Sequence, residues 1–153
     1  MQTFLPYRDF VKCAKTLDKG RLGKQRVEAK QIIDLLDGIT DNNWKHHVAT
    51  RSWIGYTPCL KLYFNTVIEE WVERKYENNM PLYRVKRKVL FPPWFKDDRV
   101  FQSHRCNLVR KDPVFYGKFG WKVDPEAPYF WPVPMRTKSK QKAMIEYWGQ
   151  QWQ

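Results

Sequence analysis

Apolar residues recur at helical spacing along much of the chain, and the clearest case runs from about Gly20 to Leu36. Its apolar positions share one face of a helix: Leu22, Ala29, Ile33 and Leu36. Its polar positions fall within an arc of about 100° on the adjoining side: Arg21, Lys24, Gln25 and Glu28. Asp37-Gly38 follows as a stop signal. The pattern predicts a helix that packs by one face and presents polar groups beside it.

Further helices are predicted on both sides of this segment. Thr57-Pro58 is a good N-cap followed by proline at the first helical position, and it begins a helix that is predicted to reach about Tyr76. Shorter helices are predicted over residues 9–16, 98–111 and 138–148, with a turn at residues 17–20. Asp112-Pro113 ends the second of these.

The remaining stretches predict loops. Residues 78–97 and 125–134 are rich in proline and lack helical periodicity. We find no internal repeat and no domain boundary. The sequence therefore predicts a mainly α fold, a compact single-domain helical bundle over residues 1–153 with long loops rich in proline and aromatic residues.

The charge balance indicates a polyanionic partner. The chain has 28 Lys and Arg against 16 Asp and Glu, a formal net charge of +12. Nucleic acid, an anionic membrane surface and an acidic protein all fit this charge. Aromatic rings beside cations, as in Trp44-Lys45, favour nucleic acid, because bases stack on rings while cations hold phosphates. Most of the rings are nevertheless expected to fill the core.

Other features limit the location and the chemistry. The first residues lack the pattern of a signal peptide and no apolar stretch reaches membrane-spanning length, so we expect a cytoplasmic protein without a membrane partner. Three widely spaced cysteines, at 13, 59 and 106, predict reduced thiols. Adjacent His46 and His47 cannot face one way on a helix, so we expect neither a metal site nor another cofactor. A histidine could instead contact phosphate, orient another group or lie at the edge of the core.

Two clusters of charge have open interpretations. The run at residues 84–88 has four cations, which either form a solvated face or contact phosphates: Arg84, Lys86, Arg87 and Lys88. Glu28 stands among Arg21, Lys24, Gln25 and Arg26. It either pairs with the cations within the helix or manages protons beside a bound phosphate backbone. In the second interpretation, Arg21, Gln25 and Arg26 contact the DNA.

Residues 17–29 (LDKGRLGKQRVEA) resemble the signature of a bacterial and phage family that is related to the pyrimidine-dimer DNA glycosylases of the endonuclease V class. Further blocks in the same order support the resemblance: residues 44–47 (WKHH), 51–56 (RSWIGY), 103–113 (SHRCNLVRKDP) and 128–132 (PYFWP). The resemblance implies a compact helical domain that bends duplex DNA, extrudes a damaged or modified pyrimidine and cleaves its glycosidic bond.

The same resemblance implies roles for individual residues. In the characterised relatives, the N-terminal α-amine attacks the sugar C1′ to form a Schiff base, and a glutamate on the first long helix supports this chemistry and the strand cleavage that follows. Here these groups would be the amine of Met1 and the carboxylate of Glu28, with Arg26 holding phosphate or the sugar. An α-amine is a weaker base than a lysine amine and is therefore more often neutral near pH 7.

Two features differ from those relatives. Their second residue is small, whereas Gln2 is bulky and should leave Met1 in place. Their carboxylate directly follows the arginine, whereas Val27 separates Arg26 from Glu28 and rotates the carboxyl by about 100°. Two alternative routes stay open. Lys24 could form the Schiff base, or water activated by Glu28 could attack, in which case the reaction stops at an abasic site.

DNA contacts follow from the same blocks. His47, Arg51, His104 and Arg105 would clamp the backbone near the helix, and an aromatic ring would occupy the gap left by the base: Trp53, Tyr56 or Trp131. Two other functions stay open: a non-catalytic nucleic-acid-binding module on the same fold, and an enzyme that tailors modified bases in viral DNA.

Overall fold

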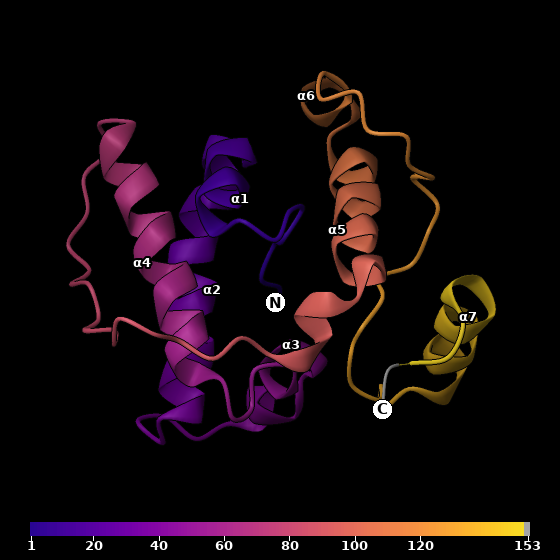
Figure 1. The fold of residues 1–153 in the computed structure, drawn as a ribbon, viewed down its shortest axis with the longest axis horizontal. Coiled ribbons are helices and arrows are strands. Elements are labelled where there is room, and N and C mark those ends of the chain that lie inside the picture. Colours follow the sequence, from indigo (N-terminus) through magenta and orange to yellow (C-terminus); the bar gives the residue numbers. More distant parts are fainter. Residues whose placement is uncertain (152–153) are drawn as a thin grey trace. The chain divides into compact units, whose positions relative to one another are not determined.

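A computed structural model describes residues 1–151, which form helices and loops without a β-strand (Figure 1). The mainly α prediction is therefore confirmed. The chain divides into two compact units, one from Met1 to Pro92 and one that begins at Pro93. The single-domain organisation stays a prediction. None of the helices in the described part of the chain is long and apolar enough to cross a membrane.

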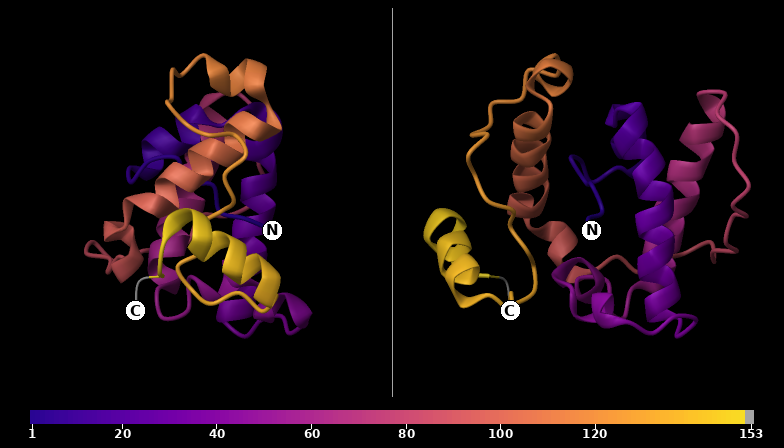
Figure 2. Two further views of the ribbon diagram at one scale, coloured as in Figure 1. Left: turned by 90° about the vertical axis from the view of Figure 1, so that its right-hand side faces the viewer. Right: turned by 180° about the vertical axis from the view of Figure 1, so that it is seen from behind.

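The first unit is built on two long helices that pack side by side, α2 and α4 (Figures 1 and 2). A short helix, α1, packs on α4, and a 3₁₀ turn (η1) followed by one turn of helix, α3, contacts α2. The bounds are α1 Phe10–Thr16, α2 Lys19–Leu36, η1 Asn43–His46, α3 Val48–Arg51 and α4 Thr57–Glu73. The predicted helices over residues 9–16 and 20–36 are thus present, and η1 and α3 were not predicted.

Side-chain caps fix where the first helices begin. The Asp9 carboxylate accepts a hydrogen bond from the Lys12 amide at 3.0 Å, and Asp18 accepts from the Arg21 amide at 3.3 Å. α2 therefore begins at Lys19, one residue before the predicted start. It ends as expected at Leu36, because Gly38 takes the left-handed conformation with φ 75°.

The start and the end of α4 differ from the prediction. Tyr56 is the N-cap and Thr57 is already helical, so no side chain caps this helix. Pro58 fits the first turn all the same, since amide groups there have no partner within the helix. The helix ends at Glu73 rather than near Tyr76, because Lys75 adopts φ 70° and its amide bonds to the Val72 carbonyl at 2.9 Å.

The loop that follows α4 returns along that helix. Asn65 on α4 holds it from both sides: the Tyr83 amide donates to Asn65 Oδ1 at 2.8 Å, and Asn65 Nδ2 donates to the Tyr83 carbonyl at 2.9 Å. The Tyr83 ring packs edge-on against Phe64. Beyond this anchor comes the basic loop, whose four cations are all exposed: Arg84, Lys86, Arg87 and Lys88. The predicted loop is confirmed for residues 78–92, whereas residues 93–96 form a 3₁₀ turn that the sequence does not predict.

The second unit contains a 3₁₀ turn, η2 Pro93–Lys96, and the helices α5 Asp98–Lys111, α6 Pro113–Gly117 and α7 Lys138–Trp148. α5 and α7 match the predicted ranges. Asp112-Pro113 ends α5 but also starts α6, since Asp112 caps it by accepting from the Phe115 amide at 3.0 Å. The proline loop is held to α7 by a bond from Trp148 Nε1 to the Pro128 carbonyl at 2.8 Å.

Candidate active site

The N-terminal segment of the first unit is buried although it has no regular structure. Residues 2–6 are all buried. Gln25 on α2 binds this segment twice: its Nε2 donates to the Gln2 carbonyl at 2.9 Å, and its Oε1 accepts from the Phe4 amide at 2.9 Å. The Tyr63 hydroxyl on α4 lies 2.5 Å from the same Oε1 and 3.1 Å from the Phe4 carbonyl oxygen. Two helices therefore fix the path of residues 2–4.

Burial keeps this hydrogen-bond network uncharged. Gln25 and Tyr63 are both completely buried. Burial raises the pKa of Tyr63 well above its usual value, so its hydroxyl stays protonated. The sequence prediction that Gln25 contacts DNA does not fit this position, because its amide faces the N-terminal segment and not solvent. Gln25 instead positions the segment.

Trp53 belongs to the same anchor. Its Nε1 donates to the Thr3 hydroxyl at 3.1 Å, and its exposed fraction is 0%. The proposed role of Trp53 in filling the gap left by a base is therefore corrected: no part of its ring reaches solvent. Tyr56, the second ring suggested for this role, is partly exposed and occupies the N-cap position of α4 without a capping bond from its side chain.

Glu28 lies beside the N-terminal segment. Its Oε2 accepts from the Gln2 amide at 3.2 Å and from Gln25 Nε2 at 3.4 Å. Among residues 1–151, Oε1 has no hydrogen-bond partner, and neither Glu28 nor Lys24 forms an ion pair. Pairing within the helix, one of the two interpretations of Glu28, is thus not what the structure contains. Arg21 instead pairs with Asp18 at 3.1 Å, and Lys24 is exposed.

Met1 extends the cluster toward η1 and α3. Its sulfur lies 3.8 Å from the Thr50 hydroxyl, which donates to the Trp44 carbonyl at 2.9 Å. His47 is close enough to the terminal amine for the amine charge to act on it: burial, then the amine, then Arg51 lower the pKa of His47. His47 Nδ1 accepts from the Ala49 amide at 3.0 Å, so this nitrogen carries no proton and His47 caps α3.

One aromatic ring at this cluster is open to solvent. The Trp44 side chain is 51% exposed, and its ring centroid lies 5.5 Å from that of His47. The sequence shows Trp44 only as a ring beside a cation. Trp44 differs from Trp53 in how exposed it is, and exposure depends on the tertiary structure. Arg51, one turn further along, bonds through Nε to the His46 carbonyl at 3.0 Å.

Arg26 does not share the face of Glu28. Side chains two positions apart on a helix point about 200° away from each other. The Arg26 guanidinium accordingly lies 4.1 Å from the centroid of the Trp71 ring on α4. It also donates to Asn78 at 3.3 Å. α2 approaches Trp71 closely here, since a Cβ on Gly23 would lie 3.2 Å from that ring. Arg26 packs α2 against the end of α4 and is not placed to hold the sugar at Glu28.

The predicted site residues of the second unit have different surroundings. His104 is buried, and its burial, with a smaller effect of Arg105, lowers the pKa of His104 to about 3. A buried neutral ring packed against Tyr129 is a core group, so a backbone clamp at His104 is corrected. Trp131 is also buried, with an exposed fraction of 8%, which leaves little of its ring for a base, while Arg105 is partly exposed.

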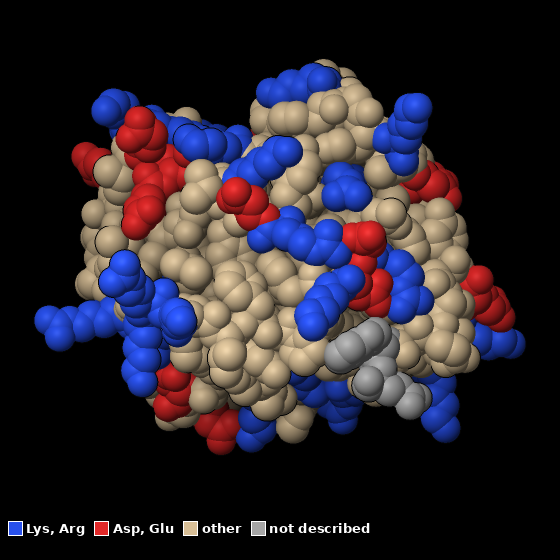
Figure 3. All heavy atoms as spheres, in the orientation of Figure 1, with Lys and Arg blue, Asp and Glu red and all other residues tan. Residues whose placement is uncertain are grey.

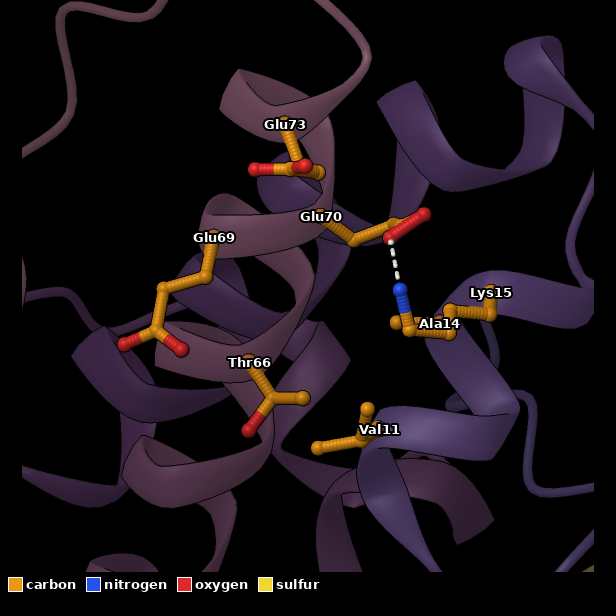
Figure 4. Close-up of a pocket in the computed structure, with 7 residues that line it drawn as sticks. All are labelled: Val11, Ala14, Lys15, Thr66, Glu69, Glu70 and Glu73. Carbon is orange, nitrogen blue, oxygen red and sulfur yellow. Dashed lines mark ion pairs between the residues drawn. The ribbon is translucent and has the colours of Figure 1, made fainter.

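The charged surface is uneven. Figure 3 shows Lys and Arg side chains spread over the face in view, with acidic side chains and uncharged areas between them. A separate groove of about 210 Å³ lies between α1 and α4 and is largely acidic (Figure 4): Val11, Ala14, Lys15, Thr66, Glu69, Glu70 and Glu73 line it. Lys15 pairs with Glu70 at 3.5 Å. None of the predicted site residues lines this groove.

The described residues include no group of three or more His, Cys, Asp and Glu side chains that could hold a metal ion. The arrangement at the N-terminus instead brings an amine, a carboxylate, an imidazole and an exposed ring to one place. A family model described as pyrimidine dimer DNA glycosylase matches residues 1–84, more than half of the chain. No curated protein and no solved structure matches the chain.

Proposed function

Because the chain belongs to the pyrimidine dimer DNA glycosylase family, we propose that it cleaves the glycosidic bond of a damaged or modified pyrimidine in duplex DNA, with the terminal amine as nucleophile. One observation carries this proposal: the Gln2 amide, one residue from the terminal nitrogen, donates to Glu28 Oε2 at 3.2 Å. The amine and the carboxylate therefore belong to one site, although 27 positions separate residues 1 and 28 in the sequence.

The chemistry suits this pair. The neutral amine attacks C1′ of the deoxyribose, and the bond from C1′ to the base nitrogen breaks as the base leaves with the bonding electrons. The attached nitrogen then gives one proton to a base such as Glu28. The C1′–O4′ bond breaks as the second proton passes to O4′, so the sugar ring opens and a Schiff base forms at C1′. Glu28 is placed to accept a proton and to stabilise positive charge on the sugar, since its Oε1 is not engaged within the described residues. Removal of the 2′ proton from the Schiff base would then break the C3′–O bond by β-elimination, with the 3′ phosphate as leaving group, and so cleave the strand.

The anchored segment explains how the amine stays in place. Catalysis requires reacting atoms to be held at near-contact distance, and an unstructured terminus would be mobile. Gln25, Tyr63 and Trp53 hold residues 2–4 by side-chain hydrogen bonds from three helices or turns. These residues therefore support the nucleophile without touching DNA.

Binding and extrusion of the base draw on exposed groups. Trp44, rather than Trp53, offers a ring to the stacked or displaced base beside the amine. Arg51 and the basic loop supply positive charge to the same unit, and a duplex that binds them is held through its phosphates. The reacting base must leave the helix, because stacking hides the glycosidic bond from attack.

The test is borohydride trapping on duplex DNA with a pyrimidine dimer or an abasic site, using a chain whose terminus is Met1. Borohydride reduces a Schiff base to a stable amine link, and tryptic mass mapping then locates it. A link on residues 1–8, which end at Arg8, supports the terminal amine. A link on a peptide that contains an uncleaved Lys24 assigns the lysine and contradicts the proposed nucleophile.

Glu28→Gln is the variant that tests the carboxylate. It keeps an acceptor for the Gln2 amide but cannot take a proton, so we expect base release to fall by about 10²–10⁴-fold with DNA affinity within a few fold. Glu69→Gln, an exposed change on α4, is the matched control. Unchanged base release in Glu28→Gln would contradict the assignment. Salt-sensitive binding without any base release by the unmodified chain would favour the non-catalytic module.

A further inference from the structure

The Gln2 side chain carries a buried donor that has no partner. Gln2 is 7% exposed, and its Nε2 makes no hydrogen bond within the described part of the chain. Its other amide atom, Oε1, accepts from the Thr3 amide at 2.8 Å. This bond fixes the orientation of the side-chain amide, because a flip would place the NH₂ group against the Thr3 N–H. The free group is therefore a donor.

A donor in this state is unusual and costs free energy, since nearly all buried polar groups in proteins are paired. The backbone of Gln2 is also held on both sides: its N–H donates to Glu28, and its carbonyl accepts from Gln25. The side chain cannot leave without breaking these bonds or the one to Thr3. Its Nε2 is thus a preorganised donor within the proposed active site, one residue from the partly exposed Met1.

We propose that Gln2 Nε2 donates a hydrogen bond to the O2 carbonyl oxygen of the extruded pyrimidine; this inference rests on the proposed function. Both natural pyrimidines of DNA carry O2 on the carbon next to the glycosidic nitrogen. O2 is therefore the base acceptor nearest to C1′, where the amine attacks. O4 lies across the ring from the glycosidic nitrogen and is therefore farther from C1′.

This bond would serve both recognition and catalysis. When the glycosidic bond breaks, negative charge develops on the leaving base and is shared by O2. A donor at O2 stabilises that charge, and a donor placed in advance acts more strongly in the transition state than in the bound substrate. Gln2 would then be the residue that touches the leaving group, while Glu28 acts on the sugar.

Gln2→Met tests the inference. Methionine keeps the length of the side chain and is bulky enough to leave Met1 in place, but it has no donor. Base release is measured as cleavage of the glycosidic bond in duplex DNA with a pyrimidine dimer, because the cut pyrimidine stays joined to its neighbour through the dimer ring. It is compared with binding to the same duplex carrying a tetrahydrofuran site, which has no base. We expect kcat/KM for base release to fall by about 10–100-fold, with Kd for the tetrahydrofuran duplex within about threefold.

Gln2→Glu is a second variant that keeps the acceptor for the Thr3 amide and replaces the donor by an oxygen. Because it also adds negative charge beside Glu28 when ionised, base release should fall at least as far as in Gln2→Met. Gln31→Met, an exposed change on α2, controls for the substitution itself. Thermal melts verify that each variant is folded. An equal loss of base release and of tetrahydrofuran binding, or no loss of either, would overturn the inference. Absence of base release by the unmodified chain would instead refute the proposed function, and this inference with it.

Discussion

Replacement of Gln25 by leucine tests whether side chains fix the N-terminal segment. Leucine is similar in size but has no polar atom. Two buried backbone groups are then left without their partner: the Phe4 N–H and the Gln2 carbonyl, which now bond to Gln25 at 2.9 Å each. The Tyr63 hydroxyl retains the Phe4 carbonyl as a partner. The loss is thus limited to two groups.

The magnitude follows from these hydrogen bonds. A buried polar group left without its partner costs about 1–3 kcal/mol, so two such groups cost about 2–6 kcal/mol. The apolar leucine recovers part of this by its own burial, and we expect a loss of about 3 kcal/mol in the free energy of unfolding. Domains are stable by about 5–15 kcal/mol, so the variant should remain folded.

Urea unfolding followed by tryptophan fluorescence measures this change. A loss of about 3 kcal/mol corresponds to a midpoint lower by about 1–3 M. Gln31→Leu is the matched control: Gln31 lies on the same helix, is exposed and makes no side-chain hydrogen bond within the described residues. We expect its effect to stay within about 0.5 kcal/mol.

The same variant reports on the site. If the anchor positions the amine, borohydride trapping by Gln25→Leu should slow more than tenfold under conditions where the protein is fully folded. A Gln25→Leu protein as stable as the control would refute the structural reasoning. A destabilised protein that traps DNA at the normal rate would refute only the positioning role.

Three further predictions concern other parts of the chain. Replacing the four cations of the basic loop by alanine should reduce the slope of log Kd against log salt by about 0.9 for each phosphate that the variant no longer neutralises; an unchanged slope would show that the loop does not touch DNA. Trp44→Ala should weaken binding to lesion DNA by about 1–3 kcal/mol if its ring stacks on a base, whereas the exposed Ile54→Ala should be neutral. Because burial lowers the pKa of His104 to about 3, the unfolded chain binds its proton more readily than the folded one. The contribution of His104 to the free energy of unfolding is fully present above its pKa in the unfolded chain, about 6.5. Below that pH it falls by about 1.4 kcal/mol for each pH unit. Melts at pH 7 and pH 5 should differ by about 2 kcal/mol in the unit that begins at Pro93, and His104→Gln should reduce the difference.

The helices could be predicted because their signals are local. Apolar spacing and the stop at Gly38 lie within a few residues of the boundaries that they set, whereas the Asp9 and Asp18 caps are found only in the structure. The sequence does not predict α6, because Asp112-Pro113 signals the end of a helix. Proline is equally suited to the first turn of the next one, and five residues are too few to show a periodicity.

Side-chain burial could not be predicted at the same level. Trp44 and Trp53 both lie in short segments without helical periodicity, and the resemblance offers Trp53, with Tyr56 and Trp131, as the ring that meets a base. In the structure Trp53 is buried on Thr3 and Trp44 is exposed beside His47. The difference arises from the path of the N-terminal segment, which occupies the space around Trp53. No pattern near either tryptophan carries that information.

The candidate active site shows that a residue can be predicted from local sequence while its partners cannot. Glu28 could be singled out by its helix face and by the resemblance of its neighbourhood, since both depend on residues close in sequence. Its actual partner is the Gln2 amide, and the group that brings the two together is Gln25. On spacing alone, Gln25 was one more polar residue on a charged face, with DNA as its expected partner. Only a segment without periodicity, threaded between α2 and α4, turns that residue inward, and the chemistry proposed for the terminal amine depends on it.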